Sequence, residues 1–536
     1  MARTYTTDLS SLLAGIVEVP AALDTRIHGV QLDSRLVKRG DLFVALAGAE
    51  NSAETFIPQA IANGANAVLV EGDCQAESEQ GREQKHEQCR VHESGDAVEL
   101  TIPELRRHLG QIAHMFFKQP SNDLQVIGVT GTNGKTSVAN FIAQMLGNDG
   151  LNTGVIGTLG YGFPVSNQAL IVSDRTTPNV FDVHRYLATL RDQKAACVVM
   201  EVSSHGLHQG RVDGVEFDGA VFTNLTRDHL DYHGSMERYA LAKQLLFQSK
   251  TLRFAVLNGE QALTQQISTS LPSTINVFEF GVGDTFDISA KQIAFDKHGI
   301  SALLTTPLGD VSLKSPLIGE FNLSNLLASI GVCVAMGRSV GCIEKVDQVV
   351  AVSGRMEMLY AEGFPTVVVD YAHTPDALSN VIAAVRRHCG GRLKVVFGCG
   401  GNRDVGKRSL MAKVVENGAD AVIVTDDNPR NESPESIVKD ILEGFESTRN
   451  VDVIHDRERA IKQAIESSEL GDVIVVAGKG HEYYQEVKGQ RVAFSDLSIS
   501  RRFLGLVAET VATENVSGGA RDTIKGSANG NGSTCT

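Results

Sequence analysis

Short apolar runs alternate with polar turns along most of the chain. In the C-terminal third, residues 366–370, 393–397, 421–425 and 473–477 form runs rich in valine and isoleucine. Such runs are typical of parallel strands that are buried on both faces. Each run ends in a glycine-rich or polar turn, where doubly wound sheets hold ligand groups. The pattern therefore predicts an α/β domain built on a parallel sheet.

The rest of the chain shows the same alternation of strand and helix patterns. Candidate strands cover residues 124–129, 197–201 and 220–223, and shorter runs lie at 29–35, 40–46 and 65–69. Residues 72–97 are polar and acidic, which predicts a solvated surface insertion. We expect three domains and a disordered polar tail, with bounds at 1–106, 107–352, 353–510 and 511–536.

Composition narrows the class of protein. A chain of 536 residues is too long for one core, and 42% apolar with 21% charged residues is usual for a soluble protein. The net charge of −15 argues against a nucleic-acid partner. Eight scattered cysteines without a C-x-x-C pair argue against a zinc ribbon or disulfide framework. With no signal peptide and no long apolar run, we expect a cytoplasmic protein without a membrane span. We also expect a monomer.

A glycine-rich turn follows the apolar run at 124–127. Residues 128–137 read Gly-Val-Thr-Gly-Thr-Asn-Gly-Lys-Thr-Ser, and a helical pattern follows. A strand, a turn and a helix start place backbone N–H groups around the phosphates of a nucleotide. In this arrangement Lys135 meets the outer phosphates and the Thr136 hydroxyl suits Mg²⁺. Val129 stands where the common P-loop has its first glycine, so this loop is a shortened variant that predicts ATP binding.

Three further clusters carry polar groups in or beside apolar patterns. Glu201 closes an apolar strand, and it is either a Mg²⁺ ligand or a helix-capping or salt-bridged residue. In the segment 223–234, Asn224 suits a nucleotide or phosphate and His229 a metal, whereas His233 fits an ordinary polar loop. Lys243 lies among apolar neighbours on a helical pattern, where a lysine usually extends its ammonium to water.

Four cations lie in turns of the acidic chain's C-terminal part. Arg355, Arg403, Arg430 and Lys479 occur in such turns. Surface arginines are common, but turns after the strands of one sheet meet at the same edge. We therefore favour a shared anion-binding cleft there.

Taken together, these motifs resemble the Mur ligases, the ATP-dependent amide-forming enzymes of peptidoglycan precursor synthesis. From about residue 27 to 505 the chain carries, in family order, T-G-T-N-G-K-T, E-V-S-S-H-G-L, N-L-T-x-D-H-L-D-x-H-G, G-x-F-N-x-x-N, S-G-R-M-E, D-Y-A-H-T-P and G-K-G-H-E. The resemblance implies an N-terminal UDP-sugar domain, a central P-loop-type ATPase domain and a C-terminal Rossmann-like domain. It also implies a role in cell-wall biogenesis, cell shape and division.

The resemblance further implies a reaction. ATP and Mg²⁺ would convert the D-Glu carboxylate of UDP-N-acetylmuramoyl-L-alanyl-D-glutamate into an acyl phosphate, which the amine of meso-2,6-diaminopimelate then attacks. The positions that match catalytic residues are Lys135, His229, Lys243 and Arg355. Metal contacts match at Thr136, Glu201 and His229, and at Lys243 as a carbamate. Carbamylation requires a neutral amine and hence a lowered lysine pKa.

The same resemblance assigns the nucleotide and sugar contacts. Positions that match ATP contacts are Gly131, Thr132, Asn133, Gly134, Lys135, Thr136, Ser137, Asn224, Asn322, Asn325, Arg355, Asp370 and His373. Positions that match contacts to the UDP-sugar and its peptide are Ser34, Thr176, Thr177, Ser203, Gln209 and Arg211. One departure lies in the first domain, where Ser52 and Ala53 replace the family's Asp-Gly and put the uridine contacts there in question.

Amino-acid specificity rests on a short turn. The positions that match diaminopimelate contacts are Arg403, Asp427, Asn428, Pro429, Arg430, Gly478 and Glu482. A guanidinium at Arg430 can grip the distal carboxylate that lysine lacks, and Glu482 is placed to receive the distal ammonium. The alternatives are the same ligation with L-lysine, a folylpolyglutamate-type or cyanophycin-type ligase, and a non-catalytic interaction protein. The last should have lost Lys135, His229 or Lys243, and all three are present.

Overall fold

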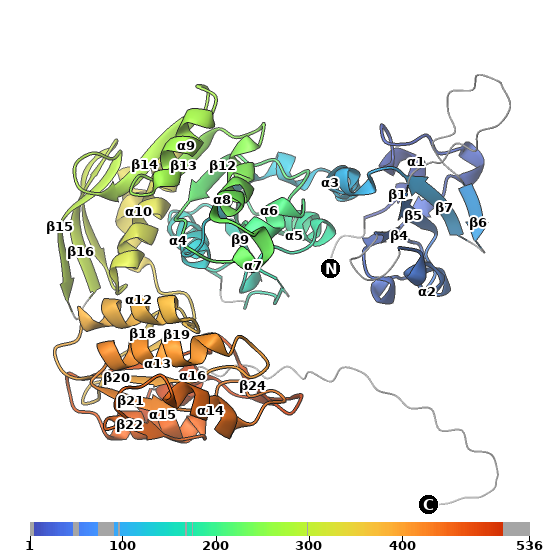
Figure 1. Ribbon diagram of the computed structural model, residues 1–536. Coiled ribbons are helices and arrows are strands. Elements are labelled where there is room, and N and C mark those ends of the chain that lie inside the picture. Colours follow the sequence, from blue (N-terminus) through green and yellow to red (C-terminus); the bar gives the residue numbers. More distant parts are fainter. Residues whose placement is uncertain are drawn as a thin grey trace, which may run out of the picture.

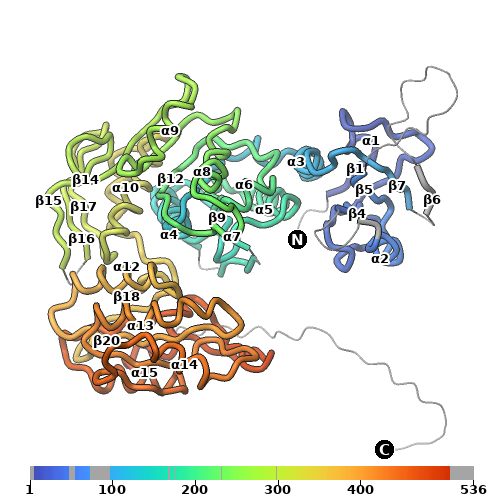
Figure 2. The backbone as a smooth tube through the Cα atoms, viewed as in Figure 1, coloured from blue at the N-terminus to red at the C-terminus, as the bar shows by residue number. Residues whose placement is uncertain are grey.

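The computed structural model describes residues 5–46, 53–72, 91–94, 97–166, 169–173, 175–296 and 299–506. They form three α/β domains that follow one another along the sequence (Figure 1). The tube in Figure 2 shows the central domain between the other two, and helix α3 (Leu105–Phe116) next to the N-terminal sheet. In this part of the chain, no helix has the length and apolar character needed to cross a membrane.

The N-terminal domain is built on a mostly parallel sheet. Its strand order is β3 (Gly29–Gln31), β4 (Asp41–Ala45), β5 (Ala67–Glu71), β7 (Ala97–Ile102) and β6 (Val91–Ser94), with only β6 antiparallel to its neighbour. Strands β1 (Thr7–Asp8) and β2 (Arg26–Ile27) form a separate antiparallel pair. The helices are α1 (Leu9–Leu12), α2 (Ile57–Ala62) and α3, with 3₁₀ turns η1 (Ala21–Leu23), η2 (Ser34–Leu36) and η3 (Ala53–Phe56).

The central domain is built on a longer sheet whose middle strands, such as β8 (Gln125–Thr130), are buried on both faces. Ile127 and Val129 of β8 point into one apolar core, while Val126 points into the other, as the continuous apolar run requires. The order is β10 (Gly160–Gly162), β9 (Thr153–Gly157), β11 (Cys197–Glu201), β8 (Gln125–Thr130), β12 (Gly219–Phe222), β13 (Phe254–Asn258), β14 (Asn276–Val282), β15 (Ile288–Asp296), β16 (Gly299–Thr306) and β17 (Gly309–Ser315). The run from β9 to β15 is parallel, and the outer pairings are antiparallel.

The helices of the central domain cover both faces of this sheet. Helix α4 (Lys135–Asn148) follows β8 directly, and its apolar side packs beside α10 (Glu320–Ala335). The others are α5 (Val180–Asp192), α6 (Ser204–His208), α7 (Leu230–His233), α8 (Met236–Gln244), α9 (Ala262–Ser270) and α11 (Val340–Glu344), with η4 (Pro120–Asp123), η5 (Leu245–Gln248) and η6 (Lys345–Gln348).

The C-terminal domain has the predicted parallel sheet. Its order is β18 (Glu357–Leu359), β19 (Thr366–Asp370), β23 (Val473–Ala477), β20 (Leu393–Phe397), β21 (Ala421–Val424) and β22 (Val451–Val453), and only β18 is antiparallel. The helices are α12 (Pro375–Arg386), α13 (Gly406–Gly418), α14 (Pro434–Leu442), α15 (Arg457–Glu466) and α16 (Asp496–Phe503). A hairpin of β24 (Tyr484–Val487) and β25 (Gln490–Ala493) lies beside the sheet.

The predicted strands lie within one or two residues of the observed ones along most of the chain. Within the polar stretch 72–97, residues 91–94 form the edge strand β6, and residues 73–90 lie outside the described residues. Ser52 and the tail at 511–536 also lie outside them. Helix α3 runs across the expected boundary at 106, and its apolar side joins the core of the N-terminal sheet. The domain bounds stay predictions.

Candidate active site

The turn between β8 and α4 has the backbone shape of a phosphate-binding loop. Gly131 and Gly134 have φ of +153° and +85°, the latter in the left-handed region that favours glycine. A Cβ at Gly134 would meet Asn325 Oδ1 at 2.6 Å, so the loop lies closely against α10. The N–H of Asn133 donates to Asn224 Oδ1 at 2.9 Å. The predicted loop and Asn224 are therefore neighbours.

Lys135 begins α4 and folds back over the loop. Its Nζ donates to the carbonyl oxygens of Gly131 and Thr132, both at 2.9 Å. Burial lowers the pKa of Lys135, and the negative charge of Glu201 opposes this effect. Ser137 follows in the first turn of α4. The carbonyl oxygens of the loop therefore hold the Lys135 ammonium against the loop.

Glu201 at the end of β11 is the centre of a buried hydroxyl cluster. Its side chain is 1% exposed. Its carboxyl accepts from Thr136 Oγ1 at 2.8 Å, from Thr158 N at 2.8 Å and from Thr158 Oγ1 at 3.1 Å. Thr176 Oγ1 lies 3.0 Å from Thr158 Oγ1. A Cβ at Gly157 would meet Glu201 Oε1 at 2.1 Å, so only glycine leaves room for this carboxyl.

Lys243 lies in α8 and is 1% exposed, so it does not extend to water. Its Nζ is 4.3 Å from the centroid of the Tyr239 ring. Burial first, and then the positive charge of Lys135, lowers the pKa of Lys243 well below its usual range, while Asp228 opposes the shift. These surroundings favour the neutral amine.

His229 and His233 differ in their surroundings. His229 has φ +53° and is half exposed, with Nε2 3.5 Å from Asp228 Oδ2. His233 is buried, and its Nε2 lies 3.0 Å from Ser204 Oγ. The ring of His205 packs edge-on against that of His229 at 4.7 Å between centroids. His229 is the accessible member of this cluster.

The residues matched to the sugar peptide cluster beside Glu201. Thr177 Oγ1 lies 3.0 Å from Ser203 Oγ and donates to the Glu201 carbonyl at 3.0 Å. Arg211 Nη1 donates to the Thr177 carbonyl at 2.9 Å, and Arg211 Nε donates to Gln209 Oε1 at 3.0 Å. One network thus joins these positions to the strand that carries Glu201.

A cavity of about 520 Å³ opens next to this network, between the N-terminal and central domains. Gln209 and Arg211 line it, together with arginines from two other segments. Its full lining is Leu32, Leu46, Arg106, Arg107, Leu109, Arg175, Asn179, Val180, His208, Gln209, Gly210, Arg211, Asp213 and Tyr232. Several guanidinium groups around one opening suit an anionic ligand.

Ser34 is not among the residues that line this cavity. It starts the 3₁₀ turn η2, it is buried, and its Oγ donates to Gln59 Oε1 at 2.7 Å. Asn63 Nδ2 donates to the Ser34 carbonyl at 2.8 Å. Both polar groups of Ser34 therefore support the local fold of the N-terminal domain.

Asn322 and Asn325 lie at the start of α10, beside the phosphate loop, and both are buried. Asn322 Nδ2 donates to the Ile318 carbonyl at 2.8 Å, and Asn325 Nδ2 donates to Asn322 Oδ1 at 3.2 Å. The two amides therefore hold each other close to Gly134.

Three residues matched to ATP contacts lie near the end of β19 in the C-terminal sheet: Arg355, Asp370 and His373. The Arg355 guanidinium lies 4.7 Å from the Tyr371 ring centroid, and its buried Nε has no hydrogen-bond partner among the described residues. Burial raises the pKa of Asp370 and lowers that of His373. After burial, the positive charge of Arg355 adds a small contribution that lowers the pKa of Lys135.

A second cavity, of about 300 Å³, lies at the carboxyl edge of the C-terminal sheet. All but one of the residues matched to diaminopimelate line it; Pro429 is absent from the described lining. The lining is Tyr371, His373, Gly398, Cys399, Gly400, Arg403, Asp404, Lys407, Asp427, Asn428, Arg430, Gly478 and Glu482. Of the four cations predicted to share an anion-binding cleft, Arg403 and Arg430 line this cavity, whereas Arg355 and Lys479 are not among the described residues of its lining.

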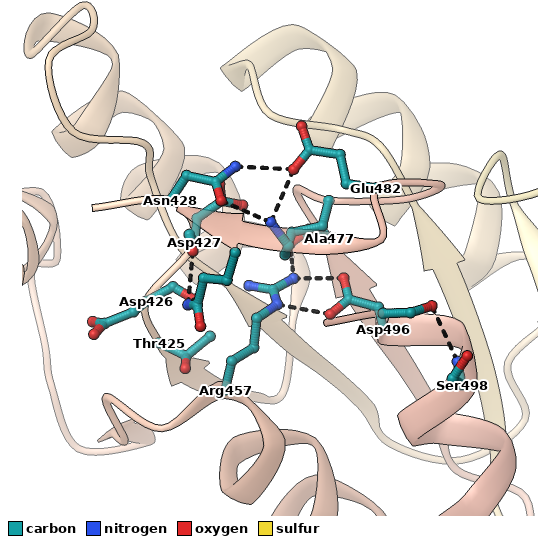
Figure 3. A network of polar contacts seen from close by, with 12 residues as sticks. Thr425, Asp426, Asp427, Asn428, Arg457, Ala477, Glu482, Asp496 and Ser498 are labelled. Carbon is teal, nitrogen blue, oxygen red and sulfur yellow. Dashed lines mark hydrogen bonds and ion pairs between the residues drawn. The ribbon is translucent and has the colours of Figure 1, made fainter. Parts of the chain in front are cut away.

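Buried polar contacts fix one wall of this cavity (Figure 3). Lys479 is 0% exposed, and its Nζ donates to Asn428 Oδ1 at 3.0 Å and to Glu482 Oε2 at 2.9 Å. Asn428 Nδ2 also donates to Glu482 Oε2 at 2.9 Å. Behind this wall, Arg457 Nε donates to Asp496 Oδ1 at 2.8 Å in a buried ion pair. Lys479 is therefore part of the wall and does not line the cavity.

Comparisons with known proteins agree with these matches. A UDP-N-acetylmuramoyl-L-alanyl-D-glutamate–2,6-diaminopimelate ligase from Ectopseudomonas mendocina is 46% identical over 473 residues, which cover 88% of this chain and 93% of that protein. One of the same name from Pseudomonas aeruginosa is 44% identical, with 90% and 96% covered. The chain belongs to the Mur ligase family.

Family models and a solved structure extend this finding along the whole Mur ligase fold. Residues 26–117 match "Mur ligase family, catalytic domain", 129–333 match "Mur ligase middle domain" and 354–480 match "Mur ligase, glutamate ligase domain". A solved UDP-N-acetylmuramoyl-L-alanyl-D-glutamate–2,6-diaminopimelate ligase has a TM-score of 0.67 and 34% identity, covering 93% of this chain and 99% of that one. The predicted family and three-domain architecture are confirmed.

The structure also brings residues to this Mur ligase's cavities that the sequence reasoning did not single out. Arg106, Arg107 and Arg175 line the larger cavity, and Tyr232 accepts a hydrogen bond from Gln209 Nε2 at 3.0 Å. Arg106 and Arg107 lie in the first turn of α3, shortly after the end of β7, a strand that was not predicted from the sequence. The pair of adjacent arginines could have indicated this site. Only cations in turns after predicted strands were grouped from the sequence, and this pair was therefore missed.

Proposed function

We propose that the protein is an ATP-dependent amide ligase that adds meso-2,6-diaminopimelate to UDP-N-acetylmuramoyl-L-alanyl-D-glutamate. The observation that carries the proposal is the 300 Å³ cavity, which presents Arg403 and Arg430 together with Asp427 and Glu482. Diaminopimelate has two carboxylates and two ammonium groups, so a lining of both signs is complementary to it. The larger cavity, with its arginines, then suits the diphosphate of the UDP-sugar.

The first chemical step joins the γ-phosphoryl group of ATP to the D-Glu carboxylate. A carboxylate oxygen attacks the γ-phosphorus, the bond to the β–γ bridging oxygen breaks, and ADP leaves. Lys135 moves from the loop carbonyl oxygens to the triphosphate, where its charge offsets the repulsion between the two anions. Arg355 adds a second positive charge from the C-terminal domain.

The buried cluster around Glu201 fits Mg²⁺. Its donors are carboxyl and hydroxyl oxygens, the hard ligands that this ion prefers, and Thr136 and Glu201 already lie 2.8 Å apart. We propose that Thr136 and Glu201 hold one Mg²⁺ and that His229 and Lys243, as a carbamate, hold a second. Bound Mg²⁺ would neutralise phosphate charge. The lowered pKa of Lys243 supports carbamylation, because CO₂ reacts with the neutral amine.

The second step forms the amide. The neutral amine of diaminopimelate attacks the acyl carbon, the carbon–oxygen bond to phosphate breaks, and the phosphate leaves with the proton that the amine loses. Asn428 and Glu482 orient the amino-acid backbone and ammonium groups, and Arg430 binds the distal carboxylate. We place the reaction in the cytoplasm, where ATP is available.

L-Lysine is the competing amino acid. Its ε-ammonium would approach Arg430 and leave that guanidinium without a carboxylate, which disfavours lysine. A non-catalytic protein would have no reason to keep Lys243 buried at 1% exposure beside Lys135.

Phosphate release by the purified full-length chain tests the proposal. Reactions contain Mg-ATP and UDP-N-acetylmuramoyl-L-alanyl-D-glutamate with meso-diaminopimelate, L-lysine or no amine, and mass spectrometry identifies the product. Turnover with diaminopimelate alone is expected. Equal turnover with lysine would contradict the Arg430 argument, and no turnover with either amine would contradict the ligase itself.

A further inference from the structure

Arg430 has an unusual backbone conformation for a residue of its size. Its φ of +53° lies in the left-handed region, which residues with a side chain rarely adopt. The β24–β25 hairpin holds it there from both sides. The Arg430 N–H donates to the Glu486 carbonyl at 3.0 Å, and the Lys488 N–H donates to the Arg430 carbonyl at 2.6 Å. Strain of this kind persists only where the surroundings fix the backbone.

The side chain of Arg430 is held as well. Its Nε lies 3.6 Å from Glu486 Oε2, and its Nη1 donates to the Gly401 carbonyl at 2.9 Å. These partners come from two separate segments, so together they fix the plane of the guanidinium. The group has five N–H donors, and the Nε edge faces Glu486. The donors left for a ligand are those of Nη2 and the second of Nη1.

Glu486 also contacts Asn428, which lies in the same turn as Arg430. Its N–H donates to Asn428 Oδ1 at 2.9 Å, the same oxygen that accepts from Lys479. Glu486 thus touches Arg430 through its carbonyl and its carboxyl group, and Asn428 through its N–H. Both of these neighbours line the 300 Å³ cavity, whereas Glu486 is absent from the described lining.

We propose that Glu486 is a positioning residue that aims the Arg430 guanidinium at the distal carboxylate of the amino-acid substrate. The inference rests on the function proposed above. Glu486 acts through Arg430 and does not touch the substrate. Its carboxyl group stops the guanidinium from turning its Nε edge into the cavity, so the Nη edge meets the substrate already oriented.

The experiment compares Glu486→Gln with the wild-type full-length chain. Glutamine keeps the length of the side chain and both backbone hydrogen bonds, and it replaces the negative carboxylate by a neutral amide. We expect the KM for meso-diaminopimelate to rise about threefold to tenfold while kcat changes less than about twofold. Glu443→Gln is the matched control, because Glu443 is exposed at the end of α14, and it should behave like the wild type.

A double-variant cycle separates positioning from a general effect on the fold. If Glu486 acts through Arg430, adding Glu486→Gln to Arg430→Met causes no further loss in kcat/KM. The inference would be overturned if Glu486→Gln caused an equal loss in both backgrounds. It would also be overturned if KM did not change, whether or not kcat fell. None of these outcomes would contradict the ligase function. A wild-type chain without diaminopimelate-dependent turnover would overturn the proposed function, and this inference with it.

Discussion

The two halves of the candidate active site treat buried charge in opposite ways. In the C-terminal half, Lys479 pairs with Glu482 at 2.9 Å and Arg457 pairs with Asp496 at 2.8 Å. In the central half, Glu201 accepts from hydroxyl groups and a backbone N–H, and no cation forms an ion pair with it among the described residues.

A buried charge without a partner costs free energy, and proteins retain it where a ligand supplies the opposite charge. We therefore propose that the central half is arranged for the charges that a nucleotide and its Mg²⁺ would supply. The wall of the amino-acid cavity balances its buried charges in pairs, which fixes the shape of that cavity. Variants in the central half should change activity more than stability, and variants of the C-terminal pairs should do the reverse.

Glu201→Gln should give the largest effect. It removes the carboxyl oxygen that Thr136 contacts at 2.8 Å, and with it the proposed Mg²⁺ ligand. We expect kcat to fall at least about a thousandfold, because the phosphoryl transfer loses electrostatic stabilisation. Phosphate release and urea unfolding measure the two quantities. A large fall in the free energy of unfolding with only a small fall in kcat would break the comparison.

Asp496→Asn should act mainly on stability. It leaves the Arg457 guanidinium buried without a counter-charge, which costs about 3–5 kcal/mol. We expect the loss as a lower urea midpoint for the C-terminal domain. Asp452→Asn serves as the control, because Asp452 is exposed on β22 and its variant should unfold like the wild type. Unchanged unfolding of Asp496→Asn would show that this pair does not support the cavity wall.

Arg430→Met should weaken the choice between amino acids. The side chain is 23% exposed, so its loss should cost about 2 kcal/mol, or about thirtyfold in kcat/KM for diaminopimelate. L-Lysine should lose less, because it offers no distal carboxylate. Competition assays with both amino acids measure the ratio. A variant that still prefers diaminopimelate by the wild-type factor would place the discrimination elsewhere in the cavity.

The sequence could predict the strands and the main site residues, but it could not predict the tertiary contacts that hold those residues. The apolar runs located the strands, because a parallel strand buried on both faces leaves a continuous signal, as at residues 393–397. The resemblance to the Mur ligases implied a shared site for Thr136 and Glu201, which lie 2.8 Å apart. It also implied one for Arg430 and Glu482, and both line the 300 Å³ cavity. The partners of Ser34 and Arg430 did not follow, because Gln59 and Glu486 meet them only through tertiary packing. No local pattern encodes such contacts.

Lys243→Met removes a proposed Mg²⁺ ligand and should lose activity, but its effect on stability, taken as a change per pH unit, should be the smallest of the predicted effects. Burial lowers the pKa of Lys243 in the folded protein, so between that pKa and the usual value of 10.5 the unfolded chain binds more protons. Wild-type stability therefore rises with pH in this window. The methionine variant has no titrating amine at this position. It should therefore be more stable than the wild type near neutral pH, by a margin in the free energy of unfolding that shrinks as pH rises.

The margin can change by at most about 1.4 kcal/mol per pH unit, and urea unfolding in CO₂-free buffer at several pH values measures it. Lys413→Met is the control, because Lys413 is exposed on α13 and should show no such trend. A margin independent of pH would mean that Lys243 is charged in the folded protein. The central half would then contain a buried lysine whose positive charge is balanced by neighbouring groups. Added bicarbonate should narrow the margin if the carbamate forms, since binding CO₂ to the folded state stabilises the wild type alone.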